Sequence, residues 1–155
     1  MKYDPIKKGL GNVFNRTPFL RKLFYRLLDL LLLRAWHIKR ELRRARKEIG
    51  EEGYVLDAGS GFGQYTYFMS RLCRSWHIKG VDVKEDQIQD CNEFFTRIGE
   101  QDRIHFELAD LTEFREEGKY HLVLCVDVME HILKDVDVFR NYSFSMTDGG
   151  ILLIS

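Results

Sequence analysis

The sequence is poor in the residues that mark secreted, metal-stabilised or disordered chains. Its three cysteines among 155 residues are far apart and form no CxxC pair, which argues against a disulfide framework and a zinc cluster. Only two prolines occur, both before residue 20, and no repeat or low-complexity segment is present. The leucine-rich run at 27–33 is too short to cross a membrane and contains Asp29. We therefore expect one cytoplasmic globular domain.

The net charge is zero, but the two signs are separated along the chain. Residues 1–50 hold 14 Lys and Arg against 4 Asp and Glu, a net of +10, whereas 51–155 hold 10 against 20, a net of −10. The basic leader could contact an anionic membrane or an acidic substrate, or it could dock on the acidic remainder of its own domain. RNA-binding and zinc-finger signatures are both absent, so nucleic acid is not expected as a partner. The sequence predicts a leader at 1–50 and a core domain at 51–155.

The leader is predicted to be a basic amphipathic helix or helix pair. Thr17 before Pro18 favours a helix start, and apolar residues then recur every three or four positions until Gly50. The apolar stripe consists of Leu20, Phe24, Leu27, Leu31, Ala35, Ile38, Leu42, Ala45 and Ile49. The opposite face carries Arg21, Lys22, Arg26, Lys39, Arg40, Arg43, Arg44 and Lys47. We expect the stripe to pack on the core domain, with membrane-peripheral contact as the alternative.

From residue 54 onward, short apolar runs alternate with helical stretches. The runs, expected to be strands, span 54–59, 77–83, 104–110, 120–126 and 149–155. Helices are expected at 64–74, 85–99 and 129–146, with at most a short helical turn at 111–118. This succession predicts an α/β fold with a Rossmann-like, doubly wound parallel sheet.

Two motifs at predicted strand ends indicate a ligand site. The run VLDAGSGFG (55–63) ends a buried strand at Asp57 and opens into a glycine-rich loop, where the backbone can turn sharply and approach a ligand closely. The next strand ends in GVDV, and Asp82 lies 19 residues beyond Gly63. A carboxylate there can accept from both hydroxyls of a ribose. The loop does not match GxGxxG, nor does it have the Lys and Ser/Thr of a triphosphate-binding loop.

Four segments in this order, LDAGSGFG, GVDV, LADL and CVDVMEHI, resemble the motifs of class I S-adenosylmethionine-dependent methyltransferases over residues 54–155. The resemblance implies S-adenosyl-L-methionine as the cofactor and a small-molecule or lipid-like acceptor, as in ubiquinone- and menaquinone-type enzymes. It implies that Asp57 and the loop hold the methionine part, Asp82 the ribose, and Val83, Asp110 and the Leu111 backbone the adenine. The implied cofactor-binding set is Asp57, Ala58, Gly59, Ser60, Gly61, Gly63, Asp82, Val83, Asp110, Leu111 and Val126.

The same family has seven strands, the last two forming a hairpin, whereas this chain ends inside the expected fifth strand. The resemblance therefore implies a domain shortened at its C-terminus. Two functions stay open: methyl transfer, or a cofactor-binding remnant or interaction module without turnover.

Residues after the fourth predicted strand are the candidates for proton transfer. His131 is the best-placed base for a hydroxyl or amine nucleophile, although it could instead cap or pack the start of its helix. Asp127, Glu130 and His131 also resemble, in spacing, a divalent-metal trio of quinone-pathway O-methyltransferases. We do not expect a metal, because Mg²⁺ prefers oxygen ligands and the Glu130 and His131 side chains can point apart.

Overall fold

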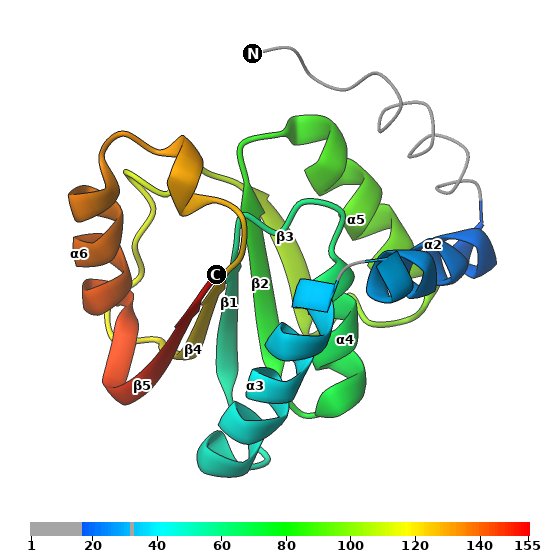
Figure 1. The fold of residues 1–155 in the computed structure, drawn as a ribbon, viewed down its shortest axis with the longest axis horizontal. Coiled ribbons are helices and arrows are strands. Elements are labelled where there is room, and N and C mark those ends of the chain that lie inside the picture. The colour runs from blue at the N-terminus through cyan, green and yellow to red at the C-terminus, as the bar shows by residue number, and fades with distance from the viewer. Residues whose placement is uncertain (1–16, 32) are drawn as a thin grey trace.

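The computed structural model describes residues 17–31 and 33–155, whose strands form one all-parallel sheet (Figure 1). The strands are β1 (Tyr54–Ala58), β2 (His77–Asp82), β3 (Ile104–Leu108), β4 (Tyr120–Cys125) and β5 (Met146–Ile154), in the spatial order β3-β2-β1-β4-β5. The chain adds β2 and β3 on one side of β1 and then β4 and β5 on the other side. In such sheets ligands bind at the carboxyl ends of the strands where this change of direction occurs, here β1 and β4. The predicted doubly wound parallel sheet is confirmed.

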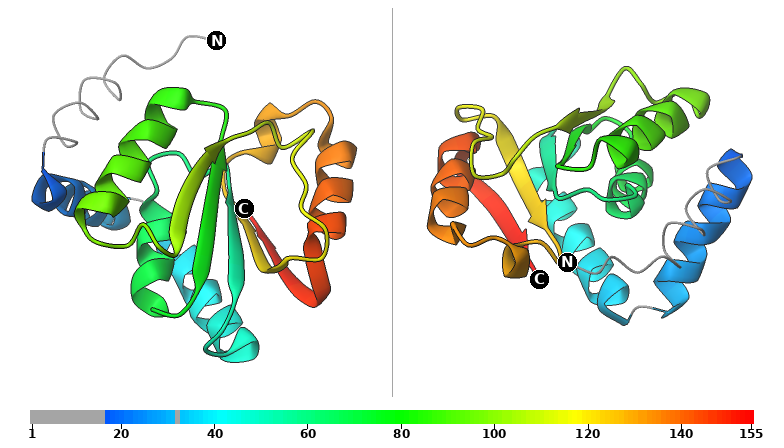
Figure 2. Two further views of the ribbon diagram at one scale, coloured as in Figure 1. Left: turned by 180° about the vertical axis from the view of Figure 1, so that it is seen from behind. Right: turned by 90° about the horizontal axis from the view of Figure 1, so that it is seen from above.

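The helices cover both faces of the sheet, as Figure 2 shows from behind and from above. They are α2 (Pro18–Leu31), α3 (Leu33–Ile49), α4 (Gln64–Leu72), α5 (Glu85–Arg97) and α6 (Asp135–Ser145), with a short 3₁₀ turn, η1 (Met129–His131). Successive strand residues alternate between two buried clusters. Val55 and Leu122 pack with the face that α2 to α5 cover, whereas Leu56 and Val123 pack with the α6 face. Both faces are thus buried, which explains the continuous apolar runs.

The described part of the leader, from residue 17 onward, forms the helix pair that its periodicity predicted and packs on the core domain, whereas residues 1–16 lie outside the described residues. Ala35, Ile38, Leu42 and Ala45 on α3 are all buried, so this part of the predicted stripe is confirmed. Two assignments on α2 were wrong. Arg21, placed on the solvated face, is 2% exposed, and Leu27, placed in the buried stripe, is 44% exposed. The cause is rotation of α2 about its axis relative to α3, which a single periodic pattern across both helices cannot represent.

The predicted helix at 129–146 was also wrong in its extent. The chain leaves β4 through Asp127 in the left-handed region (φ 57), forms η1, and passes through an extended Ile132 before α6 begins at Asp135. Asp135 and Asp137 lie in the first turn of α6, where carboxylates interact favourably with the helix dipole. The periodic pattern therefore merged two elements separated by a turn.

The two edges of the sheet differ in how they are covered. At β3, the Asn92 side chain donates to the Phe106 carbonyl at 2.8 Å and accepts from the Phe106 N–H at 2.9 Å, which occupies the edge as a neighbouring strand would. β5 forms the other edge and begins three residues earlier than predicted, with an irregularity in its pairing to β4. Within residues 17–31 and 33–155, no helix combines the length and apolar character needed to cross a membrane.

Candidate functional site

The first part of the candidate site is the buried carboxylate at the end of β1. Asp57 is 2% exposed and accepts a hydrogen bond from the Thr66 hydroxyl at 2.6 Å. Burial raises the pKa of Asp57 to about 6, even though the Thr66 hydrogen bonds lower it, and the nearby Asp82 charge adds to the rise. No cation among the described residues pairs with Asp57, and a buried carboxylate left unpaired in this way is costly, so this position favours a positively charged ligand group.

The glycine loop after β1 has a conformation that other residues would strain. Gly59, Gly61 and Gly63 have φ values of 78°, 51° and 74°. A Cβ at Gly59 would lie 2.2 Å from Cγ2 of Val128, which places the segment after β4 directly against the loop. The N–H groups of Gly59 and Ser60 both donate to the Val81 carbonyl, at 2.8 and 2.9 Å. The loop is thereby fixed between the ends of β1, β2 and β4, where sequence analysis expected the crevice.

Asp82 at the end of β2 is oriented by the same loop. Its Oδ2 accepts from the Gly61 N–H at 2.9 Å, and its Oδ1 accepts from the Lys84 N–H at 3.1 Å. A carboxylate has about four lone-pair sites, so two backbone bonds leave acceptor capacity for a ligand. The residue is therefore held in place and still able to accept from hydroxyl groups.

Two buried polar atoms beside the loop have no hydrogen-bond partner in the described chain. They are Oγ of Ser60 and Oε1 of Gln87, in side chains that are 8% and 5% exposed. A Cβ at Gly61 would have the Gln87 oxygen as its nearest contact, at 3.9 Å, so space is open on that side of the loop. Because buried polar groups are nearly always satisfied, these atoms indicate a polar ligand or ordered water. Gln87 was missed by sequence analysis, since a glutamine inside a helix carries no local signal.

The residues expected at the adenine end lie at the carboxyl ends of β2 and β3. Val83 is 64% exposed and available as an apolar surface, whereas Leu111 is buried in the core. The N–H and hydroxyl of Thr112 both donate to Oδ1 of Asp110 at 2.8 Å, and these bonds lower the pKa of Asp110. Asp110 is thus ionised at neutral pH, and Thr112 holds its carboxylate through Oδ1.

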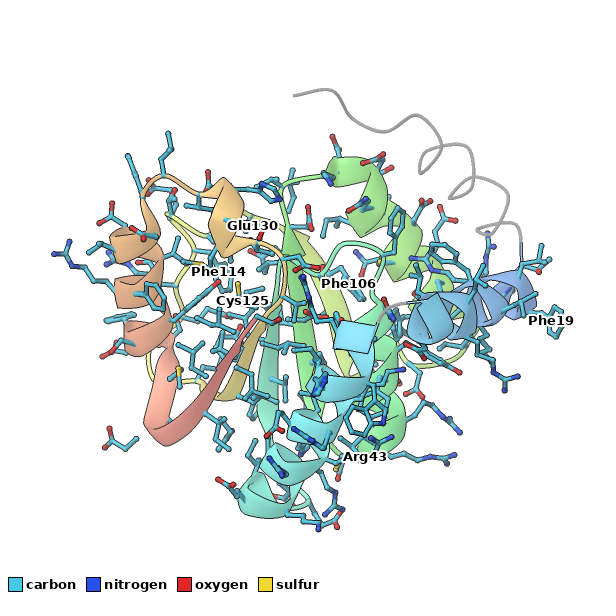
Figure 3. All side chains as sticks on the ribbon, in the orientation of Figure 1. Phe19, Arg43, Phe106, Phe114, Cys125 and Glu130 are labelled. Atoms are coloured by element: carbon cyan, nitrogen blue, oxygen red, sulfur yellow. The ribbon has the colours of Figure 1, made fainter. Side chains whose placement is uncertain are left out.

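The segment after β4 lies beside the glycine loop at the carboxyl edge of the sheet. Ala58 at the end of β1 is fully buried, and Val126 after β4 is half-buried. Asp127 forms an ion pair with Arg34 of α3, and Nε2 of His131 lies 3.5 Å from Oε1 of Glu130. Figure 3 shows Glu130 near the carboxyl edge of the sheet.

The trio of Asp127, Glu130 and His131 is therefore divided between two pairs of side chains. In the described part of the chain, no three His, Cys, Asp or Glu side chains come together as a metal-binding group. Arg34 was not foreseen as a site residue, because its proximity to Asp127 depends on how α3 packs.

Helix α2 lies over the loop from the outer side. Arg21 donates to the Phe62 carbonyl at 3.0 Å and to the Tyr25 hydroxyl at 2.9 Å, and that hydroxyl donates to the same carbonyl at 2.5 Å. The guanidinium also lies 5.1 Å from the Phe94 ring centroid. Two side chains of the leader thus hold the backbone of the glycine loop, which links the leader to the site.

Asp29, which interrupts the leucine run, provides a second link. It accepts from Gln64 of α4 at 2.7 Å and forms an ion pair with Lys39 of α3. Tyr65 is half-buried next to this group, and burial together with the charges of Asp57 and Asp29 raises its pKa. The leader therefore places a polar group against α4, the helix that begins directly after the glycine loop.

A separate hollow of about 460 Å³ opens beside Asp110, on the α6 face of the sheet. Lys79 in its wall forms ion pairs with Glu107 and Glu116, at 2.9 and 3.1 Å. Three of its charged side chains are thus paired with one another, unlike the buried atoms at the glycine loop that have no partner among the described residues. We therefore place the functional site at the loop.

Comparison with known proteins agrees with this fold. A family model described as a methyltransferase domain matches residues 55–150, well over half of the chain, so the chain belongs to this family. The fold is that of the class I S-adenosylmethionine-dependent methyltransferases, whose cofactor is S-adenosyl-L-methionine. The solved structure of geranyl diphosphate methyltransferase in complex with SAM aligns with a TM-score of 0.68 and 18% identity, covering 76% of this chain and 47% of that one.

Two relatives are similar in sequence. Phosphoethanolamine N-methyltransferase 1 of Triticum aestivum is 30% identical over 103 residues, 65% of this chain and 20% of the relative. A protein of Synechococcus sp. is 30% identical over 101 residues, 64% of this chain and 24% of the relative. The chain therefore spans about a quarter or less of the length of these relatives. The predicted family membership is confirmed, whereas likeness to the quinone-type members stays a prediction.

Proposed function

We propose that the crevice between β1, β2 and β4 binds S-adenosyl-L-methionine and supports methyl transfer to a small-molecule or lipid- or quinone-like acceptor. The observation that carries the proposal is the pair of buried atoms without a partner among the described residues, Oγ of Ser60 and Oε1 of Gln87. They lie beside a loop in which Gly59 has no room for a side chain. When bound, the cofactor supplies an activated methyl group on a sulfonium, so the protein mainly has to align the nucleophile.

Each part of the crevice has its own task in this proposal. Asp57, buried and short of a cation, would hold the ammonium end of the methionine part, together with the backbone of the glycine loop. Asp82, fixed by two backbone N–H groups, would accept from the ribose hydroxyls. Val83 and Asp110 would contact the adenine, one through its exposed apolar side chain and the other through its free oxygen.

The acceptor would enter on the β4 side. The His131 side chain is 54% exposed and can take a proton from a hydroxyl or amine nucleophile while its imidazole is neutral. Arg34 and Asp127 lie at the same mouth as an exposed ion pair, which offers a cation to an anionic acceptor and a carboxylate to an amine. The N-methyltransferase relative makes amines one acceptor class to test beside phenols.

The binding part is tested by calorimetric titration with S-adenosylhomocysteine. We expect one-to-one saturable binding for the wild-type chain and its loss in Asp82→Ala, because the ribose acceptor and the anchor of the Gly61 N–H are both removed. Asp102→Ala, which removes an exposed carboxylate from a turn far from the loop, is the matched control and should bind normally. Absence of binding by a folded wild-type chain would contradict the proposed cofactor site.

The turnover part is tested with methyl-labelled cofactor and acceptors of three kinds: hydroquinone-like phenols, ethanolamine phosphates and lipid extracts. Label should pass to one of them, and His131→Asn should lower the rate without weakening cofactor binding. Binding without any transfer would favour the alternative, a cofactor-binding or interaction module.

A further inference from the structure

Helix α2 has two apolar faces, and among the described residues only one of them packs against other parts of the chain. Phe19, Leu23 and Leu27 are spaced four residues apart and form an outward stripe, in which the side chains are 74%, 47% and 44% exposed. Figure 3 shows Phe19 pointing away from the body of the molecule at the outer end of the helix. A helix that is apolar around most of its circumference is typical of burial on both sides or of contact with a membrane.

Two cations accompany this stripe. Lys22 and Arg26 are also four residues apart, so they form a row beside Phe19, Leu23 and Leu27. Neither cation takes part in an ion pair with another described residue. The one acidic residue of α2, Asp29, points toward the body of the molecule, where it contacts Lys39 and Gln64. The outward face is therefore apolar on one side and positive on the other.

The stripe is preformed, because the opposite face of α2 is anchored. Arg21 is held by four acceptors: the Tyr25 hydroxyl, the carbonyls of Phe62 and Asp90, and the Cys91 sulfur, at 2.9 to 3.2 Å. A helix fixed in this way loses little conformational freedom when its outer face meets a partner.

We propose that the outer face of α2 docks on an anionic phospholipid membrane. An apolar stripe with flanking cations matches the boundary between acyl chains and acidic headgroups, and each cation near such a surface strengthens binding about five-fold. The same helix contacts the glycine loop through its inner face, so docking brings the crevice to the bilayer, where a lipophilic acceptor is concentrated. The inference goes beyond the proposed function and does not depend on methyl transfer.

The test is flotation of the full chain with phosphatidylcholine vesicles, with and without phosphatidylserine, in the absence of cofactor. We expect the wild-type chain to float with the anionic vesicles. The variant Leu23→Gln/Leu27→Gln should bind at least about ten-fold more weakly, because the half-exposed leucines no longer enter the bilayer. Lys22→Gln/Arg26→Gln should lose about 25-fold on anionic vesicles and nothing on neutral ones.

The matched control is Leu133→Gln/Val136→Gln, which removes two other exposed apolar side chains, 102% and 57% exposed. It should float like the wild type, and all variants should keep their circular dichroism spectrum. The proposal is overturned if the wild-type chain stays unbound on anionic vesicles, or if the control loses binding as the α2 variants do. It is also overturned if the chain is a dimer without lipid that Leu23→Gln/Leu27→Gln dissociates, since the stripe would then be a self-association surface.

Discussion

The ionisation of Asp57 should cost the unliganded protein measurable stability, and the cost should depend on pH. The side chain is fully buried at the end of β1, and its pKa is raised to about 6 mainly by burial. In an unfolded chain an aspartate titrates near 3.9. Because the folded-state pKa is the higher one, the stabilising contribution is fully present below about pH 4 and is lost as the pH rises through about 6. A shift of about two units corresponds to about 3 kcal/mol.

The substitution Asp57→Asn isolates this effect. Asparagine has nearly the same shape, and its carbonyl oxygen can still accept from the Thr66 hydroxyl, but it carries no charge to desolvate. We expect the variant to be more stable than the wild type by about 2–3 kcal/mol at about pH 7.5, with a much smaller difference at about pH 4.5. The measurement is urea unfolding of both proteins across that range, and the quantity of interest is the difference in free energy of unfolding at each pH.

Two further results bear on the same reasoning. Thr66→Val removes the hydroxyl donor to the carboxylate, so it should destabilise the protein more at neutral than at acidic pH. Asp57→Asn should also weaken cofactor binding, as expected where a costly buried charge is kept for a ligand. A wild-type chain more stable than Asp57→Asn at about pH 7.5, or a stability difference that does not change with pH, would refute the desolvation argument.

Two other predictions concern backbone packing around the site and at the sheet edge. Gly59→Ala should destabilise the fold by about 2–5 kcal/mol, because it combines a left-handed φ with a clash on Val128. Gly61→Ala meets no atom closer than 3.9 Å, so it should cost only about 1–2 kcal/mol. Urea unfolding of the two variants measures which loses more stability. Asn92→Leu should leave the Phe106 N–H unpaired. We therefore expect about 1–3 kcal/mol of destabilisation and faster hydrogen exchange at that amide. Unchanged exchange at Phe106 would contradict the idea that Asn92 covers the β3 edge of the sheet.

The local sequence determined the sheet and the positions of the main site residues. Each apolar run followed by a helical stretch specifies one parallel strand. A residue at the end of such a strand lies at the carboxyl edge of the sheet, however the helices pack around it. Asp57, the glycine loop and Asp82 could therefore be located from the sequence pattern, because each lies at or just after the end of its own predicted strand.

Tertiary structure decided the features that depend on how helices rotate and dock. Arg21 looked like a solvated cation by periodicity, but it is buried because carbonyl groups of the glycine loop and α5 satisfy its donors. The partnership of Arg34 with Asp127 depends on the placement of α3 over the end of β4. Gln87 became a site residue only when α5 brought its oxygen beside Gly61. Periodicity records which residues share a face of one helix, whereas the partners of that face come from segments distant in the sequence.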